Sequence, residues 1–259
     1  WKYINCCRIG GTLYGLPNNR DFAAGWDSYA LRKDILDKYN IKASDIKNIK
    51  DLEKVFDLVL EKENGVVPLA CTGSLFGNFS LADGINSQVS RAGDENYGQE
   101  DEVVDIFETE EYKNRLKQVR KWYLKGYMGD NILENTSTIT EMIKNGEAFA
   151  EAVKNKPGAK VQESLKCERE MEIVQFGHPA ISYNSMAAFP WMITKNSISP
   201  ELSMKLLNLF YSDEDIMNLL AYGIEGIDYV ETEDGHIRAP EGKKGNPYYG
   251  GSCVCQISL

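Results

Sequence analysis

The chain has 259 residues, a length that fits one large domain or two lobes of ordinary size. Hydrophobic residues make up 42% and charged residues 26% of it, which excludes a chain too polar to form a core. The 29 Lys and Arg are outnumbered by 39 Asp and Glu, so the net charge is −10. Because phosphate backbones and anionic lipids recruit basic surfaces, this charge argues against nucleic acid or an anionic membrane as the main partner.

Strands and helices alternate through the first part of the chain. The proline that closes GTLYGLP favours extended backbone, so residues 11–17 are predicted as a strand. Apolar residues on one helical face predict a helix over 27–39 and a clearer one over 50–63. Residues 66–100 are rich in Gly, Ser and Asn, which predicts a strand followed by irregular structure.

Capping residues mark the helices of the middle of the chain. Thr109 precedes a long amphipathic helix, on which Trp122 and Tyr123 are expected in the core. Thr138 and Glu141 have the spacing of a capping box. The other predictions are buried strands over 148–153 and 171–176, a strand around 191–194 that includes Trp191, helices beginning at Pro157, Ser199 and Ser212, and a hairpin turn at Asp234-Gly235. The class is α/β.

Enzyme motifs are missing from the sequence. It contains no G-x-S-x-G elbow, P-loop or GxGxxG, and its two histidines, His178 and His236, lie on unlike segments. The six cysteines occur as CC, CxC and two single residues, without the CxxC spacing of a zinc site, so unligated thiols are expected rather than a metal site. No cofactor is expected. Carboxylates are abundant, so an enzyme that uses Asp or Glu stays open as an alternative.

The most informative segment for binding is LPNNRDFAAGW. Its polar residues, Asn18, Asn19, Arg20 and Asp21, follow the predicted strand directly and could bind hydroxyl groups. Trp26 could stack on the apolar face of a sugar. The alternative is a solvated turn in which Arg20 pairs with Asp21.

Two further segments carry candidate residues. Phe76 and Phe79 flank Asn78 in a glycine-containing loop, where they form either a small core or a stacking wall. Tyr183 and Ser185 lie in an uncharged stretch between two predicted strands, which suggests a buried hinge.

In this order, several segments resemble the family 1 extracellular solute-binding proteins, the capture subunits of ABC sugar importers. The resemblance covers roughly residues 8–250, and it rests on GTLYGLPNNRDFAAGWDSYALRKDILDKYNI, LKQVRKWYLKGY, EMIKNGEAFAEAVKNKPGAKVQESL, PWMITKNS, SPELSMKLLNLFYSDEDIMNLLAYGIEGIDYV and NPYYGG. It implies an α/β fold of the type II periplasmic-binding-protein kind, with one complete lobe and part of the other. The chain is therefore expected to be a fragment lacking N-terminal and C-terminal parts.

The resemblance also implies a division of the chain. Residues 1–26 would be a crossover strand and a remnant of lobe 1, and residues 27–185 would be lobe 2. Residues 186–223 would hold the return crossover and helices of lobe 1, followed by a hairpin and tail over 224–259.

Function follows from the same resemblance. A sugar or oligosaccharide would bind in an interlobe cleft and pass to ABC permease subunits, with no catalysis and no cofactor. The expected location is the extracellular face of the membrane of a Gram-positive bacterium, reached through a lipid anchor that this chain lacks. The alternatives are a carbohydrate-active enzyme and a truncated remnant that binds nothing.

Site residues are implied in the same way. Residues 18–21 would lie at the cleft floor, and Phe76 and Phe79 where relatives place sugar-facing aromatic residues. Asn155 would lie in a loop at the cleft edge, and Tyr183 and Ser185 at the return hinge.

Overall fold

The chain divides into two compact units: unit 1 comprises residues 1–22 and 183–259, and unit 2 comprises residues 23–182. The structure, a computed structural model, describes residues 2–18, 24–71, 89–91, 103–129, 132, 137–177, 179–180, 186–231, 237–238 and 240–241. Which lobe of a solute-binding protein each unit corresponds to stays a prediction. Among the helices of these residues, none combines the length and apolar character needed to cross a bilayer.

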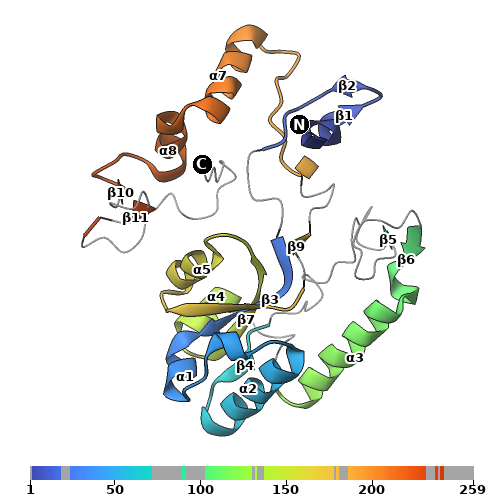
Figure 1. Cartoon of the computed structure of the whole chain (residues 1–259), viewed down its shortest axis with the longest axis vertical. Coiled ribbons are helices and arrows are strands. Elements are labelled where there is room, and N and C mark those ends of the chain that lie inside the picture. The colour runs from blue at the N-terminus through green and yellow to red at the C-terminus, as the bar shows by residue number, and fades with distance from the viewer. Residues whose placement is uncertain are drawn as a thin grey trace. The chain divides into compact units, whose positions relative to one another are not determined.

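Unit 2 is built on a sheet in the order β4-β7-β3-β8, with β9 paired to the start of β3 (Figure 1). The strands are β3 (Ala24–Arg32), β4 (Val67–Leu69), β7 (Ala148–Asn155), β8 (Met171–Gln175) and β9 (Pro179–Ala180). β4 and β7 are parallel, whereas β3 is antiparallel to both β7 and β8. β4, β7 and β8 therefore run in one direction, and β3 runs against them.

Helices cover both faces of this sheet. The helices of unit 2 are α1 (Lys33–Lys38), α2 (Ile49–Lys62), α3 (Glu110–Leu124), α4 (Ile139–Lys144) and α5 (Ala159–Cys167). Its smaller elements are the 3-10 turns η2 (Ala43–Asp45) and η4 (Ile106–Glu108) and the pair β5 (Val89–Arg91) and β6 (Val103–Asp105). Residues of α2 and α3 pack in one core cluster and residues of α4 and α5 in another, so the sheet is the middle of three layers.

The central strand β3 contributes to both cores. Tyr29 and Leu31 lie in the larger cluster, whereas Ala30 lies in the other. The larger cluster holds Trp122, whose ring meets that of Phe56 edge-on at 5.7 Å. Burying each such side chain stabilises the fold by roughly 1.5–3 kcal/mol. Strand β3 is thus fixed from both sides.

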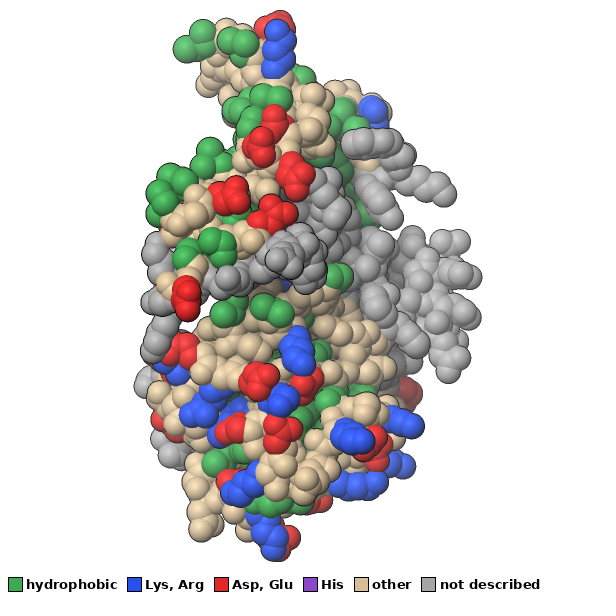
Figure 2. Space-filling model, turned by 60° about the vertical axis from the view of Figure 1, so that its left-hand side comes forward, with side chains coloured by type: hydrophobic (Ala, Val, Ile, Leu, Met, Phe, Trp, Pro, Cys, Tyr) green, Lys and Arg blue, Asp and Glu red, His purple; other side chains and the backbone are tan. Residues whose placement is uncertain are grey.

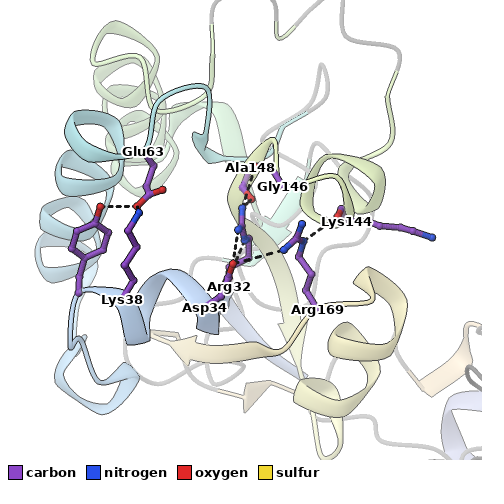
Figure 3. Close-up of polar contacts among 9 residues, drawn as sticks. Arg32, Asp34, Lys38, Glu63, Lys144, Gly146, Ala148 and Arg169 are labelled. Atoms are coloured by element: carbon purple, nitrogen blue, oxygen red, sulfur yellow. Dashed lines mark hydrogen bonds and ion pairs between the residues drawn. The ribbon is translucent and has the colours of Figure 1, made fainter.

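Arg32, the last residue of β3, joins the sheet to its helices (Figure 3). Its Nη1 donates hydrogen bonds to the carbonyls of Gly146 and Ala148 at 3.1 and 3.3 Å, and its Nε and Nη2 donate to the carboxylate of Asp34. Arg169 approaches the same carboxylate at 3.7 Å. This network holds together the end of β3, the start of β7 and the turn after α5.

The caps predicted at Thr109 and Thr138 are confirmed. Thr109 caps α3 and Thr138 caps α4, each by accepting a backbone N–H with its side chain, and Asn48, which was not predicted, caps α2 in the same way. The reciprocal bond from the Thr138 N–H to Glu141 completes the predicted capping box. The buried strands over 148–153 and 171–176 are also present, as β7 and β8.

The predicted helix over 27–39 is wrong in its first half. Residues 24–32 form β3, and only Lys33–Lys38 are helical. The apolar face that predicts the helix consists of Leu31, Ile35, Leu36 and Tyr39, and of these only Leu31 lies in β3. The pattern therefore fits the residues from Lys33 onward, and it does not support a helix over 27–32.

Other boundaries are corrected by local geometry. The helix expected at Pro157 begins at Ala159, because Gly158 has φ 77°, which no helix admits. The helix expected from Ser212 is instead capped by Asp213. Tyr123 is 46% exposed and not in the core, because its neighbour Trp122 faces inward and adjacent helical residues diverge.

Unit 1 contains α7 (Pro200–Ser212), α8 (Glu214–Tyr222) and the antiparallel pair β10 (Val230–Glu231) and β11 (Ile237–Arg238). That pairing confirms the predicted hairpin, although its turn lies outside the described residues. Near the N-terminus, the 3-10 helix η1 (Lys2–Cys7) precedes β1 (Arg8–Ile9) and β2 (Thr12–Leu13). Gly10 and Gly11 join β1 and β2, both with positive φ, as a two-residue hairpin loop requires.

The strands predicted over 11–17 and 191–194 are mostly absent. β2 covers only Thr12–Leu13, and Trp191 forms a single bridge with Leu16. Pro190 has no N–H to extend that bridge. Trp191 is half-buried and its ring lies 5.3 Å from that of Phe210.

Candidate functional site

One edge of the unit 2 sheet gathers groups that could bind a ligand. β4, β7 and β8 run together and β3 runs against them, so the carboxyl ends of three strands meet the amino end of β3. Gly25, Trp26, Asn155 and Gln175 lie there, and we call these four residues the carboxyl edge. In α/β proteins, ligands bind outside the carboxyl ends of strands.

Two side-chain amides meet at this edge. Asn155 Nδ2 donates a hydrogen bond to Gln175 Oε1 at 2.7 Å, and Gln175 Nε2 donates to the Gly177 carbonyl at 2.8 Å. Asn155 ends β7 and Gln175 ends β8, the two strands that flank β3. We call this pair of side chains the amide clasp.

The amide clasp passes close to the backbone of Gly25. Gly25 lies opposite Asn155 in the β3–β7 ladder, and a Cβ built on Gly25 would lie 2.1 Å from Gln175 Oε1. No real Cβ contact is this short, so the position requires glycine while Gln175 keeps its place. The absence of one side chain makes room for the other two to meet.

The direction of the hydrogen bonds in the clasp is set by the backbone. The Gly177 carbonyl can only accept, so the NH2 group of Gln175 faces it and Gln175 Oε1 faces Asn155. Asn155 therefore offers its NH2 group to Gln175, and its Oδ1 is an acceptor that these bonds do not use. Uncharged amides held in this way suit the hydroxyl groups of a neutral polar ligand.

A β-bulge lies beside the clasp. β3 advances three residues, from Gly25 to Ser28, while β7 advances two, from Asn155 to Val153. The extra residue falls at Trp26–Asp27, and Asp27 has φ 53°, a value uncommon for a residue with a Cβ. Bulges often occur next to functional sites, where they change the direction of a strand.

The bulge is held by bonds to Asp27. Its carbonyl accepts from the Phe176 N–H at 3.1 Å. Its Oδ1 accepts from the Tyr29 hydroxyl at 3.2 Å and from Arg115 Nη1 at 3.1 Å. Burial, and then the nearby Asp27 carboxylate, raises the pKa of Tyr29, so its hydroxyl keeps the proton that it donates.

This geometry places some of the predicted site residues but does not test whether they bind a ligand. Asn155 and the backbone of Trp26 lie at the carboxyl edge, and Asn155 ends a strand, contrary to the loop expected for it. Asn18 belongs to unit 1 and is 5% exposed, so it is buried rather than presented to solvent. The other predicted residues lie outside the described part of the chain: Asn19, Arg20, Asp21, Phe76, Phe79, Tyr183 and Ser185.

Gly25, Gln175 and the pair Asp27–Arg115 are not among the residues predicted from the sequence. Gln175 ends a predicted strand, a position at which polar residues are worth testing. Its partner Asn155 is separated from it by a helix, so only the order of strands brings the two together. Asp27 falls in the helix predicted over 27–39, and that prediction leaves no place for a bulge.

A second polar cluster lies inside unit 2. Glu151, Glu163 and Cys167 place a potential ligand atom each within 4.8 Å of one another. Lys166 Nζ already lies among them, 3.3 Å from Glu151 Oε2 and 2.8 Å from Glu163 Oε2. Burial raises the pKa of the Cys167 thiol to about 12. The cluster is thus an internal ion pair with a protonated thiol.

Unit 1 has an apolar hollow of about 610 Å³. It lies between the residues Leu16–Pro17 and one side of α7, where its lining includes Met204, Leu209 and Tyr211. The Tyr211 hydroxyl donates to the Pro17 carbonyl at 2.5 Å. Lys205 and Asn208 also line the hollow.

Sequence comparison finds relatives among transport proteins. The chain is 26% identical to a carbohydrate ABC transporter substrate-binding protein of Streptococcus pneumoniae over 256 residues, which is 96% of this chain and 51% of the relative. It is 25% identical over 254 residues to the polygalacturonan/rhamnogalacturonan-binding protein YtcQ of Bacillus subtilis, which covers 87% of this chain and 47% of YtcQ. The chain spans about half the length of these curated relatives. No family model matches it.

Comparison with solved structures also finds solute-binding proteins. The N-glycan transport solute-binding protein NgtS of Streptococcus pneumoniae matches with a TM-score of 0.76 and 24% identity, over 94% of this chain and 54% of NgtS. Its complex with Man1GlcNAc matches with a TM-score of 0.74 and 23% identity over the same shares. The Streptococcus pneumoniae protein FusA, in complex with kestose, matches with a TM-score of 0.57 and 16% identity over 92% of this chain and 53% of FusA.

The fold is therefore that of the solute-binding proteins, and the expected α/β class is confirmed. By sequence, the chain is related to the substrate-binding proteins of carbohydrate ABC transporters, as its segments indicated.

Proposed function

We propose that the chain is part of a substrate-binding component of an ABC importer and that it binds a sugar or oligosaccharide at the carboxyl edge. The observation that carries this proposal is the amide clasp at the ends of β7 and β8, in a fold shared with sugar-binding relatives. Sugars are recognised by a few well-placed polar groups and by aromatic faces. The clasp supplies the first, and Trp26, in the adjacent bulge, is the candidate for the second.

The same relatives support the proposed setting. Their names describe substrate-binding proteins of ABC transporters, so the proposed partners are permease subunits and the proposed location is the extracellular face of the membrane. Attachment would be through a lipid anchor rather than a membrane-spanning helix. The chain would act by binding alone, because its relatives are described as binding proteins and not as enzymes.

Isothermal titration calorimetry tests the binding proposal. The probes are Man1GlcNAc, kestose and oligogalacturonate, which represent the ligands in the names of the relatives. We expect one class of probe to release or absorb heat with the unmodified chain. Asn155→Ala and Gln175→Ala should each weaken that binding roughly tenfold, the effect of losing about 1.4 kcal/mol of hydrogen bonding.

The matched control is Asn145→Ala, an exposed amide in the turn after α4, which should bind as the unmodified chain does. A folded chain that binds none of the probes contradicts the proposal. Conversion of a probe to a new product, abolished by a single Asp or Glu substitution, would favour a carbohydrate-active enzyme.

A further inference from the structure

Arg115 contacts the bulge in β3, although the two are far apart in the sequence. It lies on α3, and its side chain is only 11% exposed. Nη1 donates to Asp27 Oδ1 at 3.1 Å and to Gln118 Oε1 at 2.9 Å. A buried guanidinium that loses its carboxylate partner is costly, so the pair resists separation.

Asp27 needs such an anchor because its backbone is unfavourable. A φ of 53° is uncommon for a residue with a side chain, although Asp tolerates it better than most, so the contacts around Asp27 help to decide whether the bulge keeps this shape. Its contacts come from β3 (Tyr29), the residue after β8 (Phe176) and α3 (Arg115). Arg115 is the cation in this set, and it ties the bulge to a helix outside the sheet.

The position of the bulge decides the alignment of the carboxyl edge. Ser28 and the residues after it keep the regular pairing with β7, whereas Gly25 pairs with Asn155 only because one extra residue lies between. Were the bulge to relax, Gly25 would leave its place beneath the amide clasp, and Trp26 would change its register.

We propose that Arg115 is a positioning residue for ligand binding: through its ion pair with Asp27 it holds the bulge that places the backbone of Gly25 and Trp26 at the same sheet edge as Asn155 and Gln175. The claim that Arg115 aligns the carboxyl edge is argued from geometry alone. The claim that this alignment affects ligand binding rests on the function proposed above.

The first test needs no ligand. The full chain is labelled with 5-fluorotryptophan and ¹⁵N-glycine, and the Trp26 and Gly25 signals are assigned from Trp26→Phe and Gly25→Ala. In Arg115→Met, which keeps the length of the side chain but not its charge, both signals should shift or split. The Trp191 signal, from unit 1, should stay in place.

The control is Arg120→Met on the same helix, where the side chain is exposed. Arg115→Lys keeps the charge and should restore most of the Trp26 and Gly25 signals. If Arg115→Met does not fold, Asp27→Asn tests the same ion pair from its other end. Unchanged Trp26 and Gly25 signals in a folded variant, with only a lower melting temperature, would overturn the proposal and leave Arg115 a stabilising residue.

The second test uses Man1GlcNAc as the probe. We expect Arg115→Met to bind it roughly tenfold more weakly than the unmodified chain does, with partial recovery in Arg115→Lys. Shifted signals with unchanged affinity would overturn the ligand part of the proposal. A third outcome is that the signals shift in Arg115→Met but the unmodified chain binds no probe. That result would support the role of Arg115 in aligning the carboxyl edge and would count against the proposed function, so the two failures are distinguishable.

Discussion

The indole N–H of Trp122 donates a hydrogen bond to Glu53 Oε1 at 2.8 Å, in the core of unit 2. The other carboxylate oxygen of Glu53 accepts from Lys121 Nζ at 2.6 Å. Glu53 is 9% exposed and Trp122 1% exposed, so a nearly buried carboxylate joins α2 to α3. Replacing Glu53 with Ala leaves the indole N–H without its acceptor and should lower the free energy of unfolding by about 1–3 kcal/mol in urea titrations.

The same residue gives unit 2 an acid sensitivity. Burial pushes the pKa of Glu53 upward, but the hydrogen bonds from Lys121 and Trp122 outweigh it and hold the pKa below its ordinary value. A lowered carboxyl pKa contributes stability that is present above the pKa of the unfolded chain and is lost as pH falls through the folded pKa. We expect the unmodified chain to lose more stability than Glu53→Gln between pH 6 and pH 3. Equal losses would contradict this.

Glu151 should show the opposite dependence. Its burial raises its pKa, although Lys166 opposes the effect, so the folded chain binds this proton more tightly than the unfolded chain. Its contribution is therefore greatest below the unfolded pKa and is lost as pH rises through the folded pKa. Glu151→Gln should gain stability relative to the unmodified chain as the pH of urea titrations is raised from 4.5 to 8. The exposed Glu147→Gln serves as the control, and a gain that shrinks with pH would contradict the prediction.

Gly25→Ala should separate the amide clasp. Its new Cβ would lie 2.1 Å from Gln175 Oε1, so the flexible end of the Gln175 side chain should move away and lose its hydrogen bonds, at a cost of about 1 kcal/mol. Removing the obstructing side chain should relieve the strain, so the double variant Gly25→Ala/Gln175→Ala should be less destabilised than the sum of its single variants. Thermal melts of the four chains measure this coupling. Simple additivity would mean that the two residues do not contact.

The helices of unit 1 expose large apolar side chains (Figure 2). On α7, Leu202 is 63% exposed and Leu206 50%, and on α8, Leu219 is 55% exposed. Such patches mark surfaces that associate. We expect the chain to self-associate at micromolar concentration in sedimentation velocity, and the double variant Leu202→Lys/Leu206→Lys to do so less while its melting temperature changes little. Unchanged association in that variant would place the contact elsewhere.

The sequence could predict features that depend only on residues close to one another in the chain. The caps of α2, α3 and α4 depend on residues three apart, so Asn48, Thr109 and Thr138 could be interpreted without the fold. Strand β3 was not recognised, because Leu31, near its end, continues the helical face of the residues that follow it. Its misassignment also hid the bulge at Asp27.

The candidate site was predictable only in part, for a related reason. Asn155 was found through the family resemblance, but Gln175 and Gly25 reach it only through the strand order β7-β3-β8. Arg115 meets Asp27 across a long stretch of chain, and no spacing rule connects them. The predicted sugar-facing residues Phe76 and Phe79 stay predictions.

The bulge in β3 also bears on how this sheet edge could diverge among related chains. Loss of the single codon for Asp27 would remove the extra residue and place Trp26 opposite Lys154 in a regular ladder, while Gly25 would still pair with Asn155 and the pairing from Ser28 onward would stay intact. A substitution at Trp26 changes one side chain, whereas this deletion would change the position of Trp26 and remove the acceptor of Arg115 and Tyr29 at once. Specificity at the edge could thus change in one genetic step without rebuilding the core beneath it.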